Sequence, residues 1–381
     1  MAGDIDASRD APLARATRPL IVYRDRILAR SEHAFMRRQY AAFTRLATVW
    51  VGCRRDPDLP GAGIDPLILG GDGPLGPLRR AAFKQAGVVP DLDRLRALGA
   101  ALVHAQFGRG GAIALPLARR LGLPLAVTFH GGDAHKDTHY RRLALFARRR
   151  PDLLAYAAVF VCVSDQVRDK LLARGFPAAK LRVIPIGVEP APAPVTPPAT
   201  GHLLFVGRMV EKKGVPVLLD ALARLRTAGD ATPAVLVGDG PLLPALRARA
   251  ATIGGIELPG WQTRDQLHAW MAGALGLIVP SVTGRDGDAE GLPSVAVEAM
   301  TLGVPLIASD AAGLAGAMAQ GVGRVVKAGD PAALAEALAA LIADPPARAA
   351  WAATARAVAL RDFDATRQSR LLEDTLLEAT E

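Results

Sequence analysis

Two glutamates in the segment EGLPSVAVEAM (residues 290–300) have a spacing that suits a sugar nucleotide. A helix that begins near Pro293 would leave Glu290 in the loop before it and place Glu298 inside it. Backbone N–H groups at a helix N-terminus suit phosphate and sugar oxygens. Carboxylates accept hydrogen bonds from the hydroxyls of ribose and hexose. The alternative is a capped surface helix with incidental glutamates.

The segment FVGRMVEKKG (residues 205–214) is a candidate diphosphate clamp. Gly207 ends a predicted buried strand, and Arg208 and Lys213 flank a short turn before a helix. Two cations at a strand-to-helix turn can hold a diphosphate. The alternative is that Lys212 and Lys213 are solvated loop charges.

A glycine-rich turn, FGRGGA, follows the apolar run ALVHAQF in the first half of the chain. Gly108, Gly110 and Gly111 would let the backbone approach an anion closely. The turn is not a complete G-x-G-x-x-G, and no acidic residue lies at the spacing expected for the ribose of NAD. By itself this turn is a weak indication of a phosphate site.

The segment TFHGGD ends another predicted strand of the first half. His130 would lie at the end of that strand, where it could hydrogen-bond a sugar or a transferred proton. Asp133 belongs to the same candidate substrate-binding loop. With His135 and His139 these residues could instead hold a metal, but H-E-x-x-H is absent and the segment is rich in Gly, which favours a polar loop.

Composition narrows the class of protein. A length of 381 residues suits two α/β units. Cys53 and Cys162 lie far apart and outside any C-x-x-C, which argues against a disulfide framework or a zinc ribbon. The N-terminus lacks the apolar core of a signal peptide, and no apolar run approaches the ~18–20 residues of a membrane span, so we expect a cytoplasmic protein.

A formal net charge of +9 leaves nucleic acid, a membrane surface and phosphorylated substrates as possible partners. Zinc-finger spacing, an aromatic box of the kind that binds RNA and a basic region with heptads are all absent, so we expect no nucleic acid.

Short apolar runs alternate with helical patterns, which is typical of a doubly wound parallel sheet. The runs predicted as strands are 20–23, 47–52, 101–107, 125–130, 159–164 and 181–186, then 202–207, 234–238, 256–259, 275–280, 304–309 and 324–327. Helices are predicted at 111–121 and 331–343, and an amphipathic helix from about residue 361.

Residues 189–200 contain five prolines and predict a stiff, extended linker. We therefore predict an N-terminal Rossmann-like domain over residues 1–188, a linker over 189–200, a C-terminal nucleotide-sugar domain over 201–360, and a helix over 361–381 that packs back toward the first domain. Such domains face each other across a cleft, and open α/β sheets bind ligands at the carboxyl ends of their strands.

Taken together, these motifs resemble those of the retaining glycosyltransferases of family 4, which have the GT-B fold, and especially the branch of colanic-acid or acetan type that builds bacterial exopolysaccharides. The phrases HAQFGRGGAIALPLARRLGLPLAVTFHGGD, PIGV, FVGRMVEKKG, VGDGP and PSVTGRDGDAEGLPSVAVEAM occur in that order. The resemblance covers roughly residues 19–330. Its joint motifs are more specific than any one of them.

The resemblance implies a role for each motif. Arg208 and Lys213, beside Gly207, would bind the donor diphosphate, and Glu298 the ribose hydroxyls. Glu290 would hold the transferred sugar together with the backbone of Gly291, Leu292, Pro293 and Ser294. His130 would lie near that sugar, Gly108 to Gly111 would approach the phosphates, and the base would lie near Trp261. The segment SEHAF at 31–35 departs from the family's usual Ser-Glu-Thr-Phe, which leaves the acceptor in doubt.

The resemblance implies transfer with retention, without a cofactor and without a metal. Fixed positive charge would stabilise the leaving diphosphate, and Asp286 and Asp288 are interpreted as loop-shaping. The donor would be a UDP- or GDP-sugar, and the acceptor a glycan or a polyprenyl-diphosphate-linked sugar. Two alternatives are a nucleotide-sugar-binding protein without transferase activity and a Rossmann-type oxidoreductase; the latter needs a G-x-G-x-x-G that the sequence lacks.

Two basic stretches of the first half suggest peripheral contact with the inner face of an anionic membrane. The first contains Arg24, Arg26, Arg30, Arg37 and Arg38. The second contains Arg141, Arg142, Arg148, Arg149 and Arg150 around Leu143, Leu145 and Phe146. The alternative is a solvated charged face.

Overall fold

The structure is a computed structural model that describes the chain except residues 1–17, 28–29, 57–64, 136–143, 192–200 and 286. By contacts the chain forms two compact units. Unit 1 comprises Met1–Thr128, Arg148–Phe160 and Ser369–Glu381, and unit 2 comprises Phe129–Ala147 and Val161–Gln368. The predicted domain boundaries stay a prediction, and most of the predicted linker lies outside the described residues.

Within the described residues, the first large sheet has seven strands in the order β5-β3-β1-β6-β7-β8-β9. Strand β1 pairs in parallel with both β3 and β6, so the strand order reverses between β1 and β6. Residues that are apolar on both faces form these strands, because helices cover both sides of a doubly wound sheet. The strands are β1 Arg18–Tyr23, β3 Leu46–Gly52, β5 Leu67–Ile68, β6 Leu102–Gln106, β7 Leu125–Phe129, β8 Val159–Cys162 and β9 Leu181–Val183.

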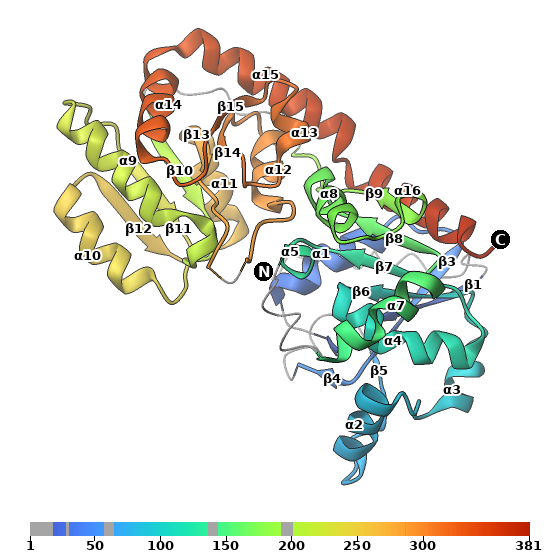
Figure 1. Cartoon of the computed structure of the whole chain (residues 1–381). Coiled ribbons are helices and arrows are strands. Elements are labelled where there is room, and N and C mark those ends of the chain that lie inside the picture. The colour runs from blue at the N-terminus through green and yellow to red at the C-terminus, as the bar shows by residue number, and fades with distance from the viewer. Residues whose placement is uncertain (1–17, 28–29, 57–64, 136–143, 192–200, 286) are drawn as a thin grey trace, which may run out of the picture. The chain divides into compact units, whose positions relative to one another are not determined.

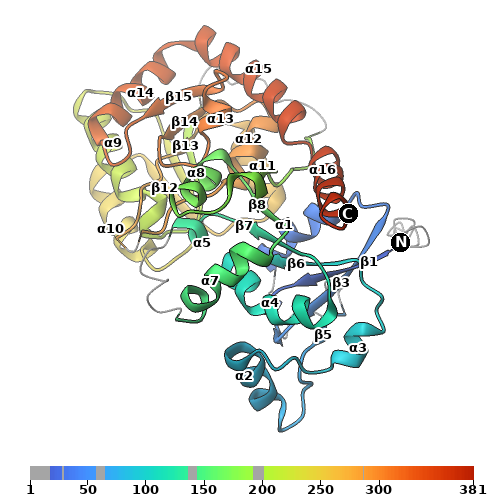
Figure 2. The ribbon, with the colours of Figure 1, turned by 45° about the vertical axis from the view of Figure 1, so that its right-hand side comes forward.

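Helix α4 lies beside β6 (Figures 1 and 2) and ends at Leu121, where the left-handed backbone of Gly122 caps it. A small parallel pair, β2 Arg26–Ile27 with β4 Arg54–Arg55, adjoins the sheet, and the sequence pattern did not predict it. The helices of this part of the chain are α1 Arg30–Tyr40, α2 Gly76–Ala86, α3 Leu92–Arg96, α4 Gly108–Leu121, α5 Gly132–His135, α7 Ala144–Tyr156, α8 Asp165–Ala173 and the 3-10 turn η2 Ala178–Lys180.

The second large sheet lies within unit 2 and has the order β12-β11-β10-β13-β14-β15. Its strand order reverses between β10 and β13, as in a dinucleotide-binding sheet. The elements are β10 His202–Val206, η3 Glu211–Lys213, α9 Val215–Thr227, β11 Ala234–Val237, α10 Leu243–Ile253, β12 Ile256–Gly260, α11 Arg264–Ala272, β13 Ala274–Val279, α12 Ser294–Thr301, β14 Leu306–Ser309, α13 Ala315–Met318, β15 Gly323–Val326, α14 Pro331–Ala343, α15 Pro345–Asp362 and α16 Ala365–Glu378.

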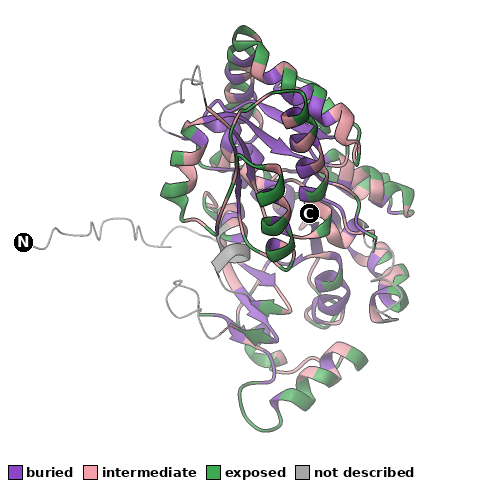
Figure 3. Cartoon of the chain, turned by 90° about the vertical axis from the view of Figure 1, so that its left-hand side faces the viewer, coloured by how far each residue is buried: buried purple, intermediate pink, exposed green. Residues whose placement is uncertain are grey.

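Alternate side chains of each strand enter different cores of unit 2. Leu203 and Phe205 pack with α9, α10 and α14, whereas Leu204 packs with α11, α12, α13 and α15. Figure 3 shows the result, with purple strands inside and green outer faces on the helices. Burial on both faces fixes the sheet rigidly and therefore fixes the loops at its strand ends.

The twelve runs predicted as strands all occur as strands, although β9 ends at Val183 and not at residue 186. The predicted helix at 331–343 is confirmed as α14, with Leu334, Leu338 and Leu341 buried. The closing amphipathic helix is α16, which buries Leu372 and Leu376 and exposes Leu371. Cys53 and Cys162 are both buried and free.

Candidate functional site

The strand-order reversal of the second sheet brings the ends of β10 and β13 together, where open α/β sheets bind ligands. Gly214 joins η3 to α9 at this edge with φ +66, a conformation that glycine adopts without strain. A Cβ atom there would lie 1.8 Å from the carbonyl oxygen of Pro280, directly after β13. Glycine thus permits the close approach that holds Lys213 at the ends of both strands.

Lys213 and Glu290 form the centre of this edge. The Nζ atom of Lys213 donates to Oε2 of Glu290 at 3.0 Å, and Nζ of Lys212 lies 3.4 Å from both Oε1 of Glu290 and Oδ1 of Asp288. Glu290 is 6% exposed. The structure therefore brings together two motifs that lie 77 residues apart in the sequence.

Burial by itself would raise the pKa of the Glu290 carboxyl, but the ammonium groups of Lys213 and Lys212 outweigh burial and hold that pKa below its ordinary value of 4.5. The carboxylate is therefore ionised at neutral pH. It is an acceptor for a sugar hydroxyl and cannot serve as a general acid there.

Gly207 and Arg208 follow β10 at the same edge. A Cβ atom at Gly207 would lie 3.4 Å from the aliphatic stem of Lys213, and a Cβ atom at Gly238 would lie 1.9 Å from the carbonyl oxygen of Gly207. These close contacts fix the turn. Arg208 is exposed, and in the described part of the chain its guanidinium has no hydrogen-bonding or ion-pair partner, so it is available to an anion.

Helix α12 begins at Ser294 with Pro293 as its N-cap, as the sequence predicted. Glu298 lies within the helix and is half-buried. No side chain caps the helix, so backbone N–H groups of its first turn remain available to donate hydrogen bonds to a ligand. This geometry fits the predicted sugar-binding stretch, whose role stays a prediction.

The loop after β7 lies against the loop of Gly291 within unit 2. A Cβ atom at Gly291 would lie 2.0 Å from the carbonyl oxygen of His130, and the hydroxyl of Ser164 donates to the carbonyl oxygen of Gly291 at 2.8 Å. Two loops that the sequence predicted to hold sugar are thus in backbone contact. Ser164 is a residue that the motifs did not indicate.

Asp133 has a local structural task. Its Oδ1 accepts hydrogen bonds from the backbone N–H groups of His130 at 2.9 Å and Gly131 at 3.0 Å. Asp133 therefore shapes the turn that carries His130. The sequence had predicted only a contact with the substrate for this residue. The side chains of His135 and His139 lie outside the described residues.

The glycines of the FGRGGA turn differ in what requires them. A Cβ atom at Gly111 would lie 2.7 Å from Val127, so packing of α4 on β7 demands glycine there. At Gly110 the same test meets nothing within 4 Å. Gly108 is buried at the start of α4. The predicted approach of this turn to phosphate stays a prediction.

Trp261 follows β12, and its side chain is 72% exposed. An exposed indole after a strand end has a free face for a base. Its predicted place beside the donor base is not tested by the fold.

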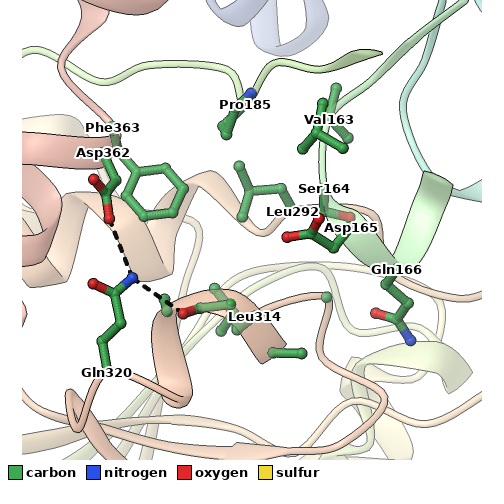
Figure 4. Close-up of a pocket in the computed structure, with 15 residues that line it drawn as sticks. Val163, Ser164, Asp165, Gln166, Pro185, Leu292, Leu314, Gln320, Asp362 and Phe363 are labelled. Atoms are coloured by element: carbon green, nitrogen blue, oxygen red, sulfur yellow. Dashed lines mark hydrogen bonds between the residues drawn. The ribbon is translucent and has the colours of Figure 1, made fainter. Parts of the chain in front are cut away.

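A separate cavity of about 300 Å³ lies in unit 2 at the start of α8 and α13. Figure 4 shows Phe363 and Gln320 on one side of the cavity, where Gln320 donates to Asp362, and Gln166 on the other side, with Leu292 between them. Among the predicted site residues, Leu292 lines it, whereas Arg208, Lys213, Glu290 and Glu298 do not. The cavity is therefore distinct from the lysine–glutamate edge.

Lys212 and Asp288 extend the site beyond the prediction. The predicted clamp did not include Lys212, which the sequence described only in the alternative of solvated loop charges, but its ion pairs join the turn after β10 to the loop before α12. Asp288 also accepts the N–H of Gly284 through its carbonyl, as a loop-shaping residue should. Across the described residues, which omit Asp286 and His139, no group of three His, Cys, Asp or Glu side chains is placed to hold a metal.

The second basic stretch differs from the predicted membrane patch. Phe146 is 1% exposed, and Arg149 is buried, where its guanidinium donates to the carbonyl oxygen of Ala112 at 3.0 Å. Both side chains are therefore buried in the fold, Arg149 in unit 1 and Phe146 in unit 2, and neither faces a membrane. Arg141, Arg142 and Leu143 lie outside the described residues, as does the side chain of Arg30.

Comparisons with known proteins match both halves of the chain. Residues 35–191 match the family described as "Glycosyltransferase Family 4", and residues 200–344 match "Glycosyl transferases group 1". The amylovoran biosynthesis glycosyltransferase AmsK of Erwinia amylovora is 31% identical over 225 residues, which are 56% of this chain and 53% of AmsK. The chain thus spans about half the length of AmsK.

This chain covers a larger share of a second relative. The GDP-mannose-dependent alpha-(1-6)-phosphatidylinositol monomannoside mannosyltransferase of Mycolicibacterium smegmatis is 30% identical over 292 residues, 70% of this chain and 74% of that protein. Among solved structures, HepE of Anabaena in complex with UDP and glucose has a TM-score of 0.75 at 18% identity, over 95% of this chain and 100% of HepE. This likeness shows the fold.

Proposed function

Because the chain belongs to the family 4 glycosyltransferases and has their GT-B fold, we propose that it transfers a hexose from a UDP- or GDP-sugar to a glycan or lipid-linked acceptor. The proposed process is assembly of an exopolysaccharide or another cell-surface polysaccharide. Relatives named for such assembly, AmsK among them, support this process.

The contact between Lys213 and Glu290 carries the proposal. It joins the predicted diphosphate clamp to the predicted sugar-binding loop at the ends of β10 and β13. Arg208, exposed beside this contact, completes the set of cations. A diphosphate held here would have its sugar next to Glu290 and the backbone after it.

In the proposed reaction, the bond between the anomeric carbon and the donor diphosphate breaks, and the acceptor oxygen bonds to the same carbon from the same face. Negative charge grows on the leaving diphosphate, where Arg208, Lys213 and the first N–H groups of α12 would stabilise it. The acceptor proton passes to the departing phosphate oxygen. This route retains configuration and needs neither a protein nucleophile nor a metal.

The remaining predicted residues would orient the donor. Glu298 would accept hydrogen bonds from the ribose hydroxyls and Trp261 would stack on the base. His130 would contact the transferred sugar, from a turn that Asp133 holds in place.

A panel of UDP-, GDP- and ADP-sugars, each assayed for hydrolysis and transfer with and without excess EDTA, tests the function. We expect one of these donors to be consumed, at the same rate with and without EDTA. Lys213→Ala should lower kcat by ~10²-fold or more, whereas Lys170→Ala, in the last turn of α8, should not. Consumption of no donor sugar, or activity that EDTA abolishes and Mg²⁺ restores, would contradict the proposed reaction.

We also propose a cytoplasmic protein that contacts the inner face of an anionic membrane. No described helix is both long and apolar enough to cross a bilayer. Arg148 is exposed and Arg150 half-buried. Arg148→Ser with Arg150→Ser should weaken sedimentation with anionic vesicles at low salt, while Arg149→Ser should lower the melting temperature. Equal sedimentation of wild type and double variant would remove this patch from membrane binding.

A further inference from the structure

The seven-stranded sheet has its own strand-order reversal, between β1 and β6. Arg24 and Asp25 follow β1, and Phe107, Gly108 and Arg109 follow β6. Ligands of open α/β sheets bind at such a position. All of these residues belong to unit 1.

Asp25 organises two cations at this edge. Its Oδ1 lies 2.6 Å from Nζ of Lys84, and its Oδ2 lies 3.8 Å from the guanidinium of Arg109. The carbonyl oxygen of Asp25 accepts the N–H groups of Cys53 at 2.9 Å and Arg54 at 3.2 Å, which fixes the residue between the ends of β1 and β3. The carboxylate is therefore a fixed anchor that orients cations from two helices.

Packing of α2 places Lys84 over this anchor. Phe83, the preceding residue, is fully buried and meets the ring of Tyr23 edge to face, with 6.1 Å between the ring centres. The side chain of Lys84 is 20% exposed and that of Arg109 is 51% exposed. Both cations are thus held by Asp25 and remain partly exposed to solvent.

Phe107 marks this edge as strained. It has φ +68 and ψ +147, a region that non-glycine residues rarely enter because of steric strain. The guanidinium of Arg24 lies 4.0 Å from the centre of its ring. This bend starts α4 with Gly108, Arg109 and Gly110, where the first N–H groups of the helix have no partners within it.

Charge at this edge favours an anion. Among the residues that the structure describes at this edge, Arg24, Lys84 and Arg109 carry three positive charges and Asp25 carries one negative charge, and the exposed Arg54 adds a fourth positive charge. Beneath them, burial raises the pKa of Cys53 to about 11, so its thiol stays neutral next to the hydroxyl of Tyr23. Cations beside buried, uncharged groups attract an anion more strongly than cations surrounded by water, because the local dielectric constant is lower.

We propose that Arg24, Lys84 and Arg109, with the first N–H groups of α4, bind the phosphate or diphosphate group of a phosphorylated acceptor. A group with two or more negative charges satisfies the net charge of the cluster, and a bidentate guanidinium matches its oxygens. This inference rests on the proposed transferase function. Arg24 is thereby assigned to an acceptor site and not to the general membrane patch.

The test is calorimetric titration of the full-length protein with inorganic pyrophosphate, inorganic phosphate and farnesyl diphosphate. Each is titrated into wild type, into K84Q/R109Q and into R119Q, a control on the same helix whose arginine pairs with Asp152. A further variant, R208A/K213A, removes the predicted donor clamp. Melting temperatures confirm that each variant is folded.

We expect K84Q/R109Q to lose at least tenfold in pyrophosphate affinity, with R119Q and R208A/K213A retaining wild-type affinity at this site. Tighter binding of farnesyl diphosphate than of pyrophosphate would identify a lipid-linked acceptor, and equal binding a soluble one. Loss of pyrophosphate binding in R208A/K213A alone would overturn the proposal. Absence of donor consumption in the sugar panel would instead overturn the transferase function, while leaving anion binding measurable.

Discussion

The ionised state of Glu290 depends on two lysines that reach it from another loop. Glu290→Gln removes the charge and should cost ~1.5–3 kcal/mol of unfolding free energy at neutral pH, the range for a hydrogen bond to a charged group. Because the folded pKa lies below the ordinary 4.5, the wild type has this stabilisation above that value and loses it as pH falls through the folded pKa.

Urea unfolding from about pH 7 to about pH 3 checks this. The difference between wild type and Glu290→Gln should narrow at the acid end. Glu336→Gln, at an exposed position of α14, is the matched control. A constant difference at all pH values would show that the carboxylate is not stabilised by its lysines.

His104 is fully buried in β6, where its ring nitrogens contact the hydroxyl of Tyr40 at 2.9 Å and that of Thr128 at 2.7 Å. Burial lowers the pKa of His104 from 6.5 to about 3. The imidazole is therefore neutral in the fold but takes a proton on unfolding below pH 6.5. Stability should fall by about 1.4 kcal/mol for each pH unit from there down to about pH 3.

His104→Gln should remove that slope from the pH dependence of the urea midpoint, although the variant is less stable overall. His268→Gln, on α11, should keep it. An unchanged slope in His104→Gln would mean that other groups set the acid stability.

At the scale of elements, α4 offers a matched pair of glycines. Gly111→Ala would place a methyl group 2.7 Å from Val127, so it should lower the melting temperature by several degrees. Gly110→Ala meets open space and should be neutral or add up to ~1 kcal/mol, since Ala favours helix. Thermal unfolding of both variants measures the difference, and equal losses would contradict this packing of α4 on β7.

Elements were predicted well where burial on both faces gives a continuous apolar run. The strands β6, β10 and β13 are examples, and the start of α12 followed from Pro293. The short pair β2 and β4 could not be predicted, because Arg26, Arg54 and Arg55 carry no apolar pattern.

At the scale of the whole molecule, the last helix binds the backbone at the start of a strand near the beginning of the chain. Glu373 of α16 is 1% exposed, and its Oε1 accepts the N–H groups of Thr44 at 2.9 Å, Arg45 at 2.7 Å and Leu46 at 2.9 Å. These contacts lie within unit 1, at the start of β3.

Glu373→Ala should therefore destabilise unit 1 by ~3 kcal/mol, because the buried N–H of Leu46 and the part-buried N–H groups of Thr44 and Arg45 lose a charged acceptor. Hydrogen exchange of the β3 amides should accelerate in step. Glu378→Ala, exposed on the same helix, should change neither. Wild-type exchange in Glu373→Ala would show that α16 does not secure β3.

The sequence by itself determined the alternation of strands and helices, the family, and the residues of the Lys213 and Glu290 motifs, because apolar periodicity and short motifs are local properties of the chain. Only the tertiary structure decided that Lys212 pairs with Asp288 and Glu290, that Asp133 shapes a turn, and that Arg149 is buried. It also decided that Asp25, Lys84 and Arg109 meet at one edge. Strand order sets these meetings, and contacts between distant residues leave no pattern in a single sequence.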